Sequence, residues 1–261
     1  RGAWKKRLTA SPAFSANARS ECGTVACGGS EGLLYCLDAG TGSELWHNDT
    51  GAITWGGVLW ADLEGDGRDE LVAGTDSRGV QVFKPDGTLL WRYPADEPAA
   101  LALEGPLAAC DLDGDGPLEV IGAAKPGPFC LNGDGTLRWQ SVIPEGEFIG
   151  GAVVADANGD GRLEVYCCDR AADELACFDA PNGALMWRAP LQGKTDVYPA
   201  SAIAVADVDC DARLEIVVGG NQGHLHCFDD AGTLKWAYAT VAHVHIAATI
   251  GDVDGDGAVE I

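Results

Sequence analysis

The sequence lacks long apolar runs, and none approaches the roughly 18 residues that a membrane-spanning helix needs. It is also short of positive charge, with 17 Lys and Arg against 40 Asp and Glu and a formal net charge of −23. Because such a field repels polyanions, it argues against nucleic acid and anionic membrane surfaces as partners. We therefore expect a soluble protein that attracts cations.

Two further absences limit the fold and the chemistry. No segment sustains the 3.6-residue period of an amphipathic helix, because glycine and β-branched residues interrupt every window. The sequence also gives no grounds for a Ser/His/Asp catalytic arrangement. The chain begins at Arg1 without a recognisable signal peptide, so a leader has been removed or the chain is a fragment.

What the sequence does have is a repeat with a period of 45 to 51 residues. Acidic loops begin at Asp62, Asp111, Asp156, Asp207 and Asp252. A short apolar stretch stands on each side of a loop, followed by a turn, an alternating segment and a segment containing tryptophan. The tryptophans keep the same rhythm at Trp46, Trp91, Trp139, Trp187 and Trp236. Units of four short strands and roughly 40 to 50 residues are typical of β-propeller blades.

The sequence therefore predicts an all-β fold, a β-propeller of four-stranded antiparallel blades that forms one domain over residues 1–261. The expected blades are 19–50, 51–94, 98–142, 145–190 and 195–240, with a partial blade at 241–261. About six or more blades are expected in the ring. Because a ring needs its edges closed, either missing C-terminal sequence or the strand at residues 1–10, around Trp4, would complete the partial blade.

The acidic loops share oxygen-bearing side chains at positions 1, 3, 5 and 9. They read DLEGDGRDE, DLDGDGPLE, DANGDGRLE, DVDCDARLE and DVDGDGAVE. Alternate positions of a tight loop point to a common centre, position 7 can offer its carbonyl, and glycine at position 6 permits a sharp turn. Ca²⁺ requires six to eight such oxygens, whereas Mg²⁺ prefers to keep its water. Carboxylates this close would repel one another without an ion, so we predict up to five Ca²⁺.

Positions 1, 3, 5, 7 and 9 of each loop supply the predicted calcium ligands. They are Asp62, Glu64, Asp66, Arg68, Glu70, Asp111, Asp113, Asp115, Pro117, Glu119, Asp156, Asn158, Asp160, Arg162, Glu164, Asp207, Asp209, Asp211, Arg213, Glu215, Asp252, Asp254, Asp256, Ala258 and Glu260. The fourth loop is expected to be the weakest site or an empty one, because Cys210 stands at position 4 and Ala212 replaces the turn glycine. The alternative is that Asp and Gly only form turns, which five copies in one phase argue against.

The loops resemble a known repeat. An acidic loop followed by Leu-Glu-Val or Leu-Glu-Ile resembles the FG-GAP/VCBS repeat of integrin α-like propellers and secreted bacterial proteins, whose loops bind calcium between the first two strands of a blade. Residues 35–46 (YCLDAGTGSELW) and 177–187 (CFDAPNGALMW) are similar to the quinoprotein, or PQQ-like, repeat, whose tryptophan packs between blades. The first resemblance implies recognition of a partner protein. The second implies an alcohol or sugar dehydrogenase, or a noncatalytic scaffold.

Ten cysteines raise the question of the redox compartment. Four share one position on the third strand, where a buried thiol would pack as a small apolar group: Cys36, Cys130, Cys177 and Cys227. Cys27 with Cys36, and Cys168 with Cys177, are nine residues apart across a hairpin, and disulfides there would fit an exported protein. Cys167 and Cys168 are similar to the vicinal disulfide of quinoprotein dehydrogenases, although they lie within an expected strand.

A ligand face is expected where the first strand of each blade begins, because these positions surround the channel of a propeller. The candidates are Trp55, Glu104, Phe148, Tyr198, His243 and His245. The alternative is that these side chains only fill the channel.

The sequence as a whole predicts a noncatalytic calcium-binding propeller that is extracellular, on the cell surface or periplasmic, and that serves recognition, adhesion or scaffolding. Its partner would be a protein or a glycan, self-association is compatible with the pattern, and neither nucleic acid binding nor membrane insertion is expected. The alternative is a PQQ-dependent dehydrogenase-like or carbohydrate-active propeller enzyme.

Overall fold

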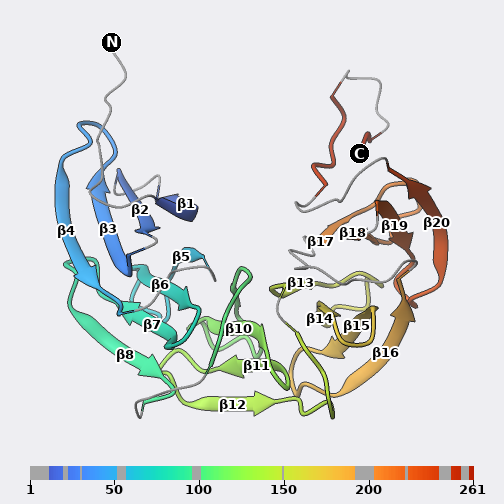
Figure 1. The fold of residues 1–261 in the computed structure, drawn as a ribbon, viewed down its shortest axis with the longest axis horizontal. Helices are drawn as coiled ribbons and strands as arrows, with labels where there is room; N and C mark the ends of the chain where they lie inside the picture. The colour runs from blue at the N-terminus through green and yellow to red at the C-terminus, as the bar shows by residue number, and fades with distance from the viewer. Residues whose placement is uncertain are drawn as a thin grey trace. The chain divides into compact units, whose positions relative to one another are not determined.

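The computed structural model describes residues 12–19, 23–29, 31–51, 57–95, 101–148, 150–191, 203–220, 223–240, 248–253 and 259–261. The regular structure within these ranges consists of β-strands (Figure 1). None of the described residues belongs to a helix long and apolar enough to cross a bilayer.

The described strands form five four-stranded sheets, each with its strands in chain order. The first two sheets are β1 (Pro12–Arg19), β2 (Thr24–Gly29), β3 (Leu33–Asp38) and β4 (Glu44–Asp49), then β5 (Val58–Ala61), β6 (Glu70–Thr75), β7 (Gly79–Phe83) and β8 (Leu89–Tyr93). The third is β9 (Ala108–Cys110), β10 (Glu119–Ala124), β11 (Gly127–Leu131) and β12 (Leu137–Gln140). The last two are β13 (Val153–Ala155), β14 (Glu164–Asp169), β15 (Glu174–Asp179) and β16 (Leu185–Pro190), then β17 (Ile203–Ala206), β18 (Glu215–Gly220), β19 (His224–Phe228) and β20 (Leu234–Ala239).

The chain packs as two compact units, one comprising Arg1–Gly122 with Cys130–Arg138 and the other Ala123–Phe129 with Trp139–Ile261. The boundary between them passes through the third sheet. The sequence placed all 261 residues in one domain, and that assignment stays a prediction.

Burial within a sheet is concentrated in its inner strands, and the second strand is fully buried in four of the five sheets. Every residue of β6, β10, β14 and β18 is buried, and their sequences are the near-continuous apolar runs expected of strands covered on both faces. The fourth strands are the most exposed, and all six residues of β20 are exposed. Each fully buried second strand nevertheless begins with a glutamate, which brings a carboxylate to the edge of the core.

Tryptophans on the fourth strands connect successive sheets. In the first unit, Trp46 Nε1 donates to the carbonyl of Pro85 at 2.9 Å and Trp91 Nε1 to that of Gly133 at 2.8 Å. In the second unit, Trp139 and Trp187 make the same bond to the sheet that follows, at 2.9 and 3.1 Å. This contact agrees with the packing that the PQQ-like resemblance implies, and it fixes each sheet against the next within its unit.

The turn under each indole ring requires glycine. These turn glycines have φ between 71° and 89°, a region that favours glycine, and they are Gly87, Gly135, Gly183 and Gly232. A Cβ added at Gly135 would stand 2.6 Å from the ring of Trp91. The glycine therefore serves both the turn and the close approach of the ring.

The first sheet differs from the sequence expectation. It begins with β1 at Pro12, whereas the first blade was expected at 19–50. The reason is that the stretch leading into this sheet has no acidic loop to mark its first strand. The other four sheets lie inside the expected ranges. At the C-terminal end, Gly251 forms an antiparallel bridge with Glu260, while Trp4 and residues 1–10 lie outside the described residues.

Replacing Gly135 by alanine tests the packing of the indole ring on the turn. We expect Gly135→Ala to lower the free energy of unfolding by about 1–3 kcal/mol more than Gly23→Ala does, because overpacking adds to the cost of a positive φ. Gly23 is a matched control, with φ of 61° and nothing within 4 Å of an added Cβ. Urea unfolding of the two variants measures the difference, and equal losses would contradict the packing argument.

Candidate metal centres in the acidic loops

Each acidic loop joins the first strand of a sheet to the second, as the FG-GAP/VCBS resemblance implies. The described loops connect β5 to β6, β9 to β10, β13 to β14 and β17 to β18. Of the fifth loop, Asp252 and Glu260 are described, while Asp254, Asp256 and Ala258 lie outside the described residues.

The aspartate at position 1 closes the loop by accepting two backbone hydrogen bonds. The N–H groups of Asp66 and Gly67 donate to the carboxylate of Asp62 at 3.1 and 2.8 Å. Asp156 and Asp207 accept from positions 5 and 6 in the same way, at 2.8 to 3.1 Å. Asp111 instead accepts from positions 4 and 6, at 2.7 and 3.1 Å. The sequence therefore folds each loop around the carboxylate of its first residue.

The glutamate at position 9 anchors the loop to the sheet. One of its oxygens, Oε2, accepts the backbone N–H of position 2 in all five loops, at 2.8 to 3.2 Å; these glutamates are Glu70, Glu119, Glu164, Glu215 and Glu260. The first four are only 1% to 4% exposed. Burial raises the pKa of Glu70, Glu119 and Glu164, because an ionised carboxylate loses hydration there.

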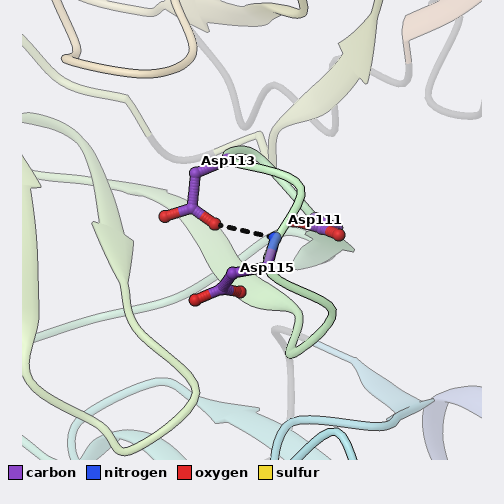
Figure 2. Close-up of side chains that lie close together, drawn as sticks. All are labelled: Asp111, Asp113 and Asp115. Atoms are coloured by element: carbon purple, nitrogen blue, oxygen red, sulfur yellow. Dashed lines mark hydrogen bonds between the residues drawn. The ribbon is translucent and has the colours of Figure 1, made fainter.

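Carboxylates gather most closely in two loops. Donor oxygens of Asp111, Asp113 and Asp115 lie within 4.8 Å of one another, and so do those of a second set, Asp207, Asp209 and Glu215. Figure 2 shows the first set on the loop between β9 and β10, with the N–H of Asp115 donating to Asp113 at 3.3 Å. Loss of hydration, followed by repulsion from Asp113, raises the pKa of Asp115.

The donor set is of the kind that calcium prefers, and in both clusters a basic side chain also lies against two of the carboxylates. Two oxygens that each lie 2.3–2.6 Å from one Ca²⁺ can be at most about 5 Å apart, and both clusters meet that limit. Every side-chain donor in them is a carboxylate oxygen, the type of ligand that a hard cation prefers. Among the described residues, three acidic side chains do not come this close in the loops at 62–70 and 156–164.

In the loops at 156–164 and 207–215, the arginine at position 7 binds an acid outside its loop. Arg162 binds Asp179 at 2.9 Å, and Arg213 binds Asp230 at 3.0 Å. Position 7 was predicted to contribute only its backbone carbonyl, so these ion pairs leave that prediction in place.

The sequence analysis missed two basic residues that contact the loops from the fourth strand. Arg138 on β12 donates to Asp113 at 2.8 Å and to Glu119 at 3.1 Å. Lys235 on β20 donates to Asp209 and, at 2.9 Å, to Glu215. The hydrogen bond from Arg138 lowers the pKa of Asp113, and those to Asp209 and Glu215 raise the pKa of Lys235. Both stand immediately before the repeated tryptophan, which is the signal that could have revealed them.

An open pocket of about 620 Å³ lies beside one of these contacts, within the first unit. Its lining includes Glu64, Trp91, Asp113, Asp115 and Arg138. Acidic side chains from two successive loops thus share one solvent-filled space.

The expected ligand face is only partly described. Glu104 is exposed, as a binding residue should be. Phe148 is fully buried and packs edge-to-face on Phe178, with ring centroids 5.9 Å apart, so its assignment to a ligand face is corrected. The remaining candidates lie outside the described residues: Trp55, Tyr198, His243 and His245.

The disulfide expected between Cys27 and Cys36 is not formed, and both residues are free thiols. Cys27 pairs with Tyr35 in the β2–β3 register, while Cys36 pairs with Ala26. Because neighbouring residues of a strand point to opposite faces, the two thiols lie on opposite sides of the sheet. A spacing of nine residues across a hairpin therefore did not predict the correct register.

The disulfide expected between Cys168 and Cys177 is also not formed. Cys168 pairs with Leu175 and Cys177 with Tyr166, which makes the two cysteines diagonal neighbours on one face. Diagonal neighbours are typically about 7–8 Å apart, too far for a disulfide. Cys167 is a free, fully buried thiol within β14, so the vicinal pair does not form the disulfide that the quinoprotein resemblance implies.

Comparison with known families supports the reading of the loops. The family model described as "FG-GAP-like repeat" matches residues 111–167, from the loop that follows β9 into β14. Residues 111–167 are an FG-GAP-like repeat. A search of curated proteins by sequence finds no match.

Solved structures with a similar fold are distant in sequence. The N-terminal region of BBS1 in complex with ARL6 has a TM-score of 0.66 at 12% identity, over 94% of this chain and 76% of that one. BamB from Moraxella catarrhalis has a TM-score of 0.60 at 15% identity, over 97% of this chain and 80% of that one. Quinohemoprotein alcohol dehydrogenase from Comamonas testosteroni has a TM-score of 0.64 at 14% identity, over 88% of this chain and 43% of that one.

These likenesses establish the predicted fold class: the five four-stranded sheets are blades of a β-propeller. They also correct one expectation. The chain was predicted to have no catalysis of its own, yet its structural neighbours include an alcohol dehydrogenase, so this fold does not separate binding modules from enzymes. The chain spans less than half of that enzyme's length, 43%.

Replacing Glu164 by glutamine tests the burial of the anchoring carboxylate. The folded-state pKa of Glu164 lies above its ordinary value of 4.5, so the folded protein binds the proton more tightly than the unfolded chain. Its contribution to stability therefore falls as the pH rises through the raised pKa. In calcium-free buffer, we expect Glu164→Gln to gain stability relative to the parent protein between pH 4.5 and pH 7.5. Urea unfolding at both pH values measures this, and a difference that does not change with pH would contradict it.

Proposed function

We propose that this FG-GAP-type propeller is a calcium-stabilised recognition module that acts outside the cytoplasm, in the periplasm, on the cell surface or in the extracellular space. The observation that carries the proposal is the repeated loop, in which a buried glutamate at position 9 and oxygen-bearing side chains at positions 1, 3 and 5 recur at the same place in successive sheets. The FG-GAP-like match to residues 111–167 supports the same reading.

The ion would neutralise charge and fix the loop. Asp156, Asn158, Asp160 and Glu164 would hold it in the third loop, and the corresponding residues would do so elsewhere. Calcium supplies a double positive charge with flexible coordination by oxygen. Since Glu164 begins a fully buried strand, an ion bound to it would tie the exposed loop directly to the sheet. Loops of this kind need only millimolar affinity where the surroundings supply calcium at that level.

Recognition would use the acidic surface that remains around the bound ions. With a net charge of −23, the chain would favour a partner that presents positive charge, because complementary potentials accelerate encounter and select the partner. A protein or a glycan remains the proposed class of partner. The BBS1 structure, which contains ARL6, is a propeller neighbour solved with a protein partner and supports this role.

Calcium should raise the melting temperature of the chain, because a ligand that binds only the folded state stabilises it by mass action. Adding EDTA should return the melting temperature to the calcium-free value. Glu164→Gln should reduce the shift produced by calcium, whereas Glu31→Gln, an exposed position outside the loops, should leave it unchanged. Differential scanning calorimetry measures all three, and a melting temperature indifferent to both calcium and EDTA would overturn the assignment.

The recognition role predicts calcium-dependent binding to a panel of glycans and basic peptides. Biolayer interferometry with the calcium-loaded chain should show binding that EDTA abolishes and that weakens with salt, since exposed charges are screened. A control protein of similar net charge without acidic loops should not show the EDTA effect. Binding no stronger than that of the control would contradict the role.

A further inference from the structure

The residue that precedes the repeated tryptophan differs in charge from sheet to sheet. It is Leu90 on β8 and Met186 on β16, but Arg138 on β12 and Lys235 on β20. The fourth strand therefore presents an apolar side chain in two of these sheets and a cation in the other two.

The two cations make the same pair of contacts. Arg138 Nη1 bonds to Asp113 Oδ2 at 2.8 Å and to Glu119 Oε1 at 3.1 Å. Lys235 Nζ bonds to Asp209 Oδ2 and to Glu215 Oε1, the latter at 2.9 Å. In both loops the contacted residues stand at positions 3 and 9, and the contacted glutamate oxygen is the one that the backbone N–H of position 2 does not use. The nitrogen thus lies between two predicted metal ligands.

The clustering of the carboxylates agrees with this arrangement. Among the described residues, the loops at 111–119 and 207–215 are the two in which three acidic side chains bring their oxygens within 4.8 Å of one another. These are the two loops that contain a basic side chain from the fourth strand. A positive charge offsets the repulsion between like charges and so favours their close approach. For the loops at 62–70 and 156–164 the residue before the tryptophan is apolar, at Leu90 and Met186, and among the described residues their acids form no such group of three.

We propose that Arg138 and Lys235 are built-in cations that replace a divalent ion in the loops at 111–119 and 207–215, so that calcium selects the loops at 62–70 and 156–164. The inference rests on the proposed calcium function and specifies which of its sites are used. An ion in either of the first two loops would have to displace the basic side chain, because both would need the same oxygens and the two positive charges repel each other.

Other charges near these loops do not alter the distinction. Lys84 lies 3.7 Å from Glu64 at the rim of the loop at 62–70, where both side chains are more than 40% exposed, at 44% and 42%. An exposed pair of this kind is weak and is readily broken. Arg138 and Lys235 are less exposed, at 23% and 29%, and each bonds to a glutamate that is almost completely buried. Arg162 and Arg213 bind Asp179 and Asp230, which lie outside the loops.

Calcium stoichiometry of the full chain, measured by isothermal titration calorimetry, tests the proposal. Lys235→Met and Arg138→Met, which introduce the residue that β16 has at this position, should each bind one more calcium ion than the parent protein. Lys125→Met is the control, since it removes an exposed basic side chain that contacts Glu147, which lies outside the acidic loops and is not a predicted ligand. Its stoichiometry should equal that of the parent protein.

The reverse substitution keeps the test decisive if either variant fails to fold. Met186→Lys should remove one calcium ion, because the new ammonium group would take the place of the ion beside Glu164. This inference would be overturned if the parent protein binds calcium and its stoichiometry is unchanged in Lys235→Met, Arg138→Met and Met186→Lys. The proposed function would then still stand. A parent protein and variants that all bind no calcium would overturn the proposed function itself.

Discussion

The rest of this structure depends on a buried carboxylate that stands at the edge of the core in four successive sheets, at Glu70, Glu119, Glu164 and Glu215. Each begins a strand that is buried on both faces, and each holds the preceding loop through one oxygen. The same loops carry acids at positions 1 and 5, and at position 3 in every loop but that at 156–164, so negative charge accumulates around each buried glutamate. Such a loop requires a positive charge, and the loops differ in where that charge comes from.

Packing between sheets explains why the loops recur at equivalent places. The tryptophan on each fourth strand from β4 to β16 donates a hydrogen bond to a backbone carbonyl in a turn of the sheet that follows within its unit. That turn needs glycine because a Cβ would collide with the indole ring. The residue before that tryptophan is brought to the acidic loop of its own sheet, as Arg138 and Lys235 show. One position on the fourth strand can therefore change the charge of a loop without altering the sheet.

The sequence was sufficient for the features that repeat. The period of the acidic loops and tryptophans predicted four-stranded sheets and the place of each loop between two strands. The PQQ-like resemblance implied the packing of tryptophan between blades. It was insufficient where the evidence lies in register or burial. Strand β1 has no acidic loop to mark it. The spacing of Cys27 and Cys36 does not show that they lie on opposite faces of the sheet. Phe148 is buried against Phe178, a residue 30 positions away. Arg138 and Lys235 reach acids 19 to 26 residues earlier in the chain, a distance that no local motif spans.

The most direct test of this account is a crystal structure of the chain at saturating calcium, with anomalous scattering used to locate the ions. The account predicts a positive charge at every buried glutamate of the four loops: a calcium ion beside Glu70 and Glu164, and the side chains of Arg138 and Lys235 beside Glu119 and Glu215. Well-ordered loops at 62–70 and 156–164 that contain no cation under these conditions would contradict it.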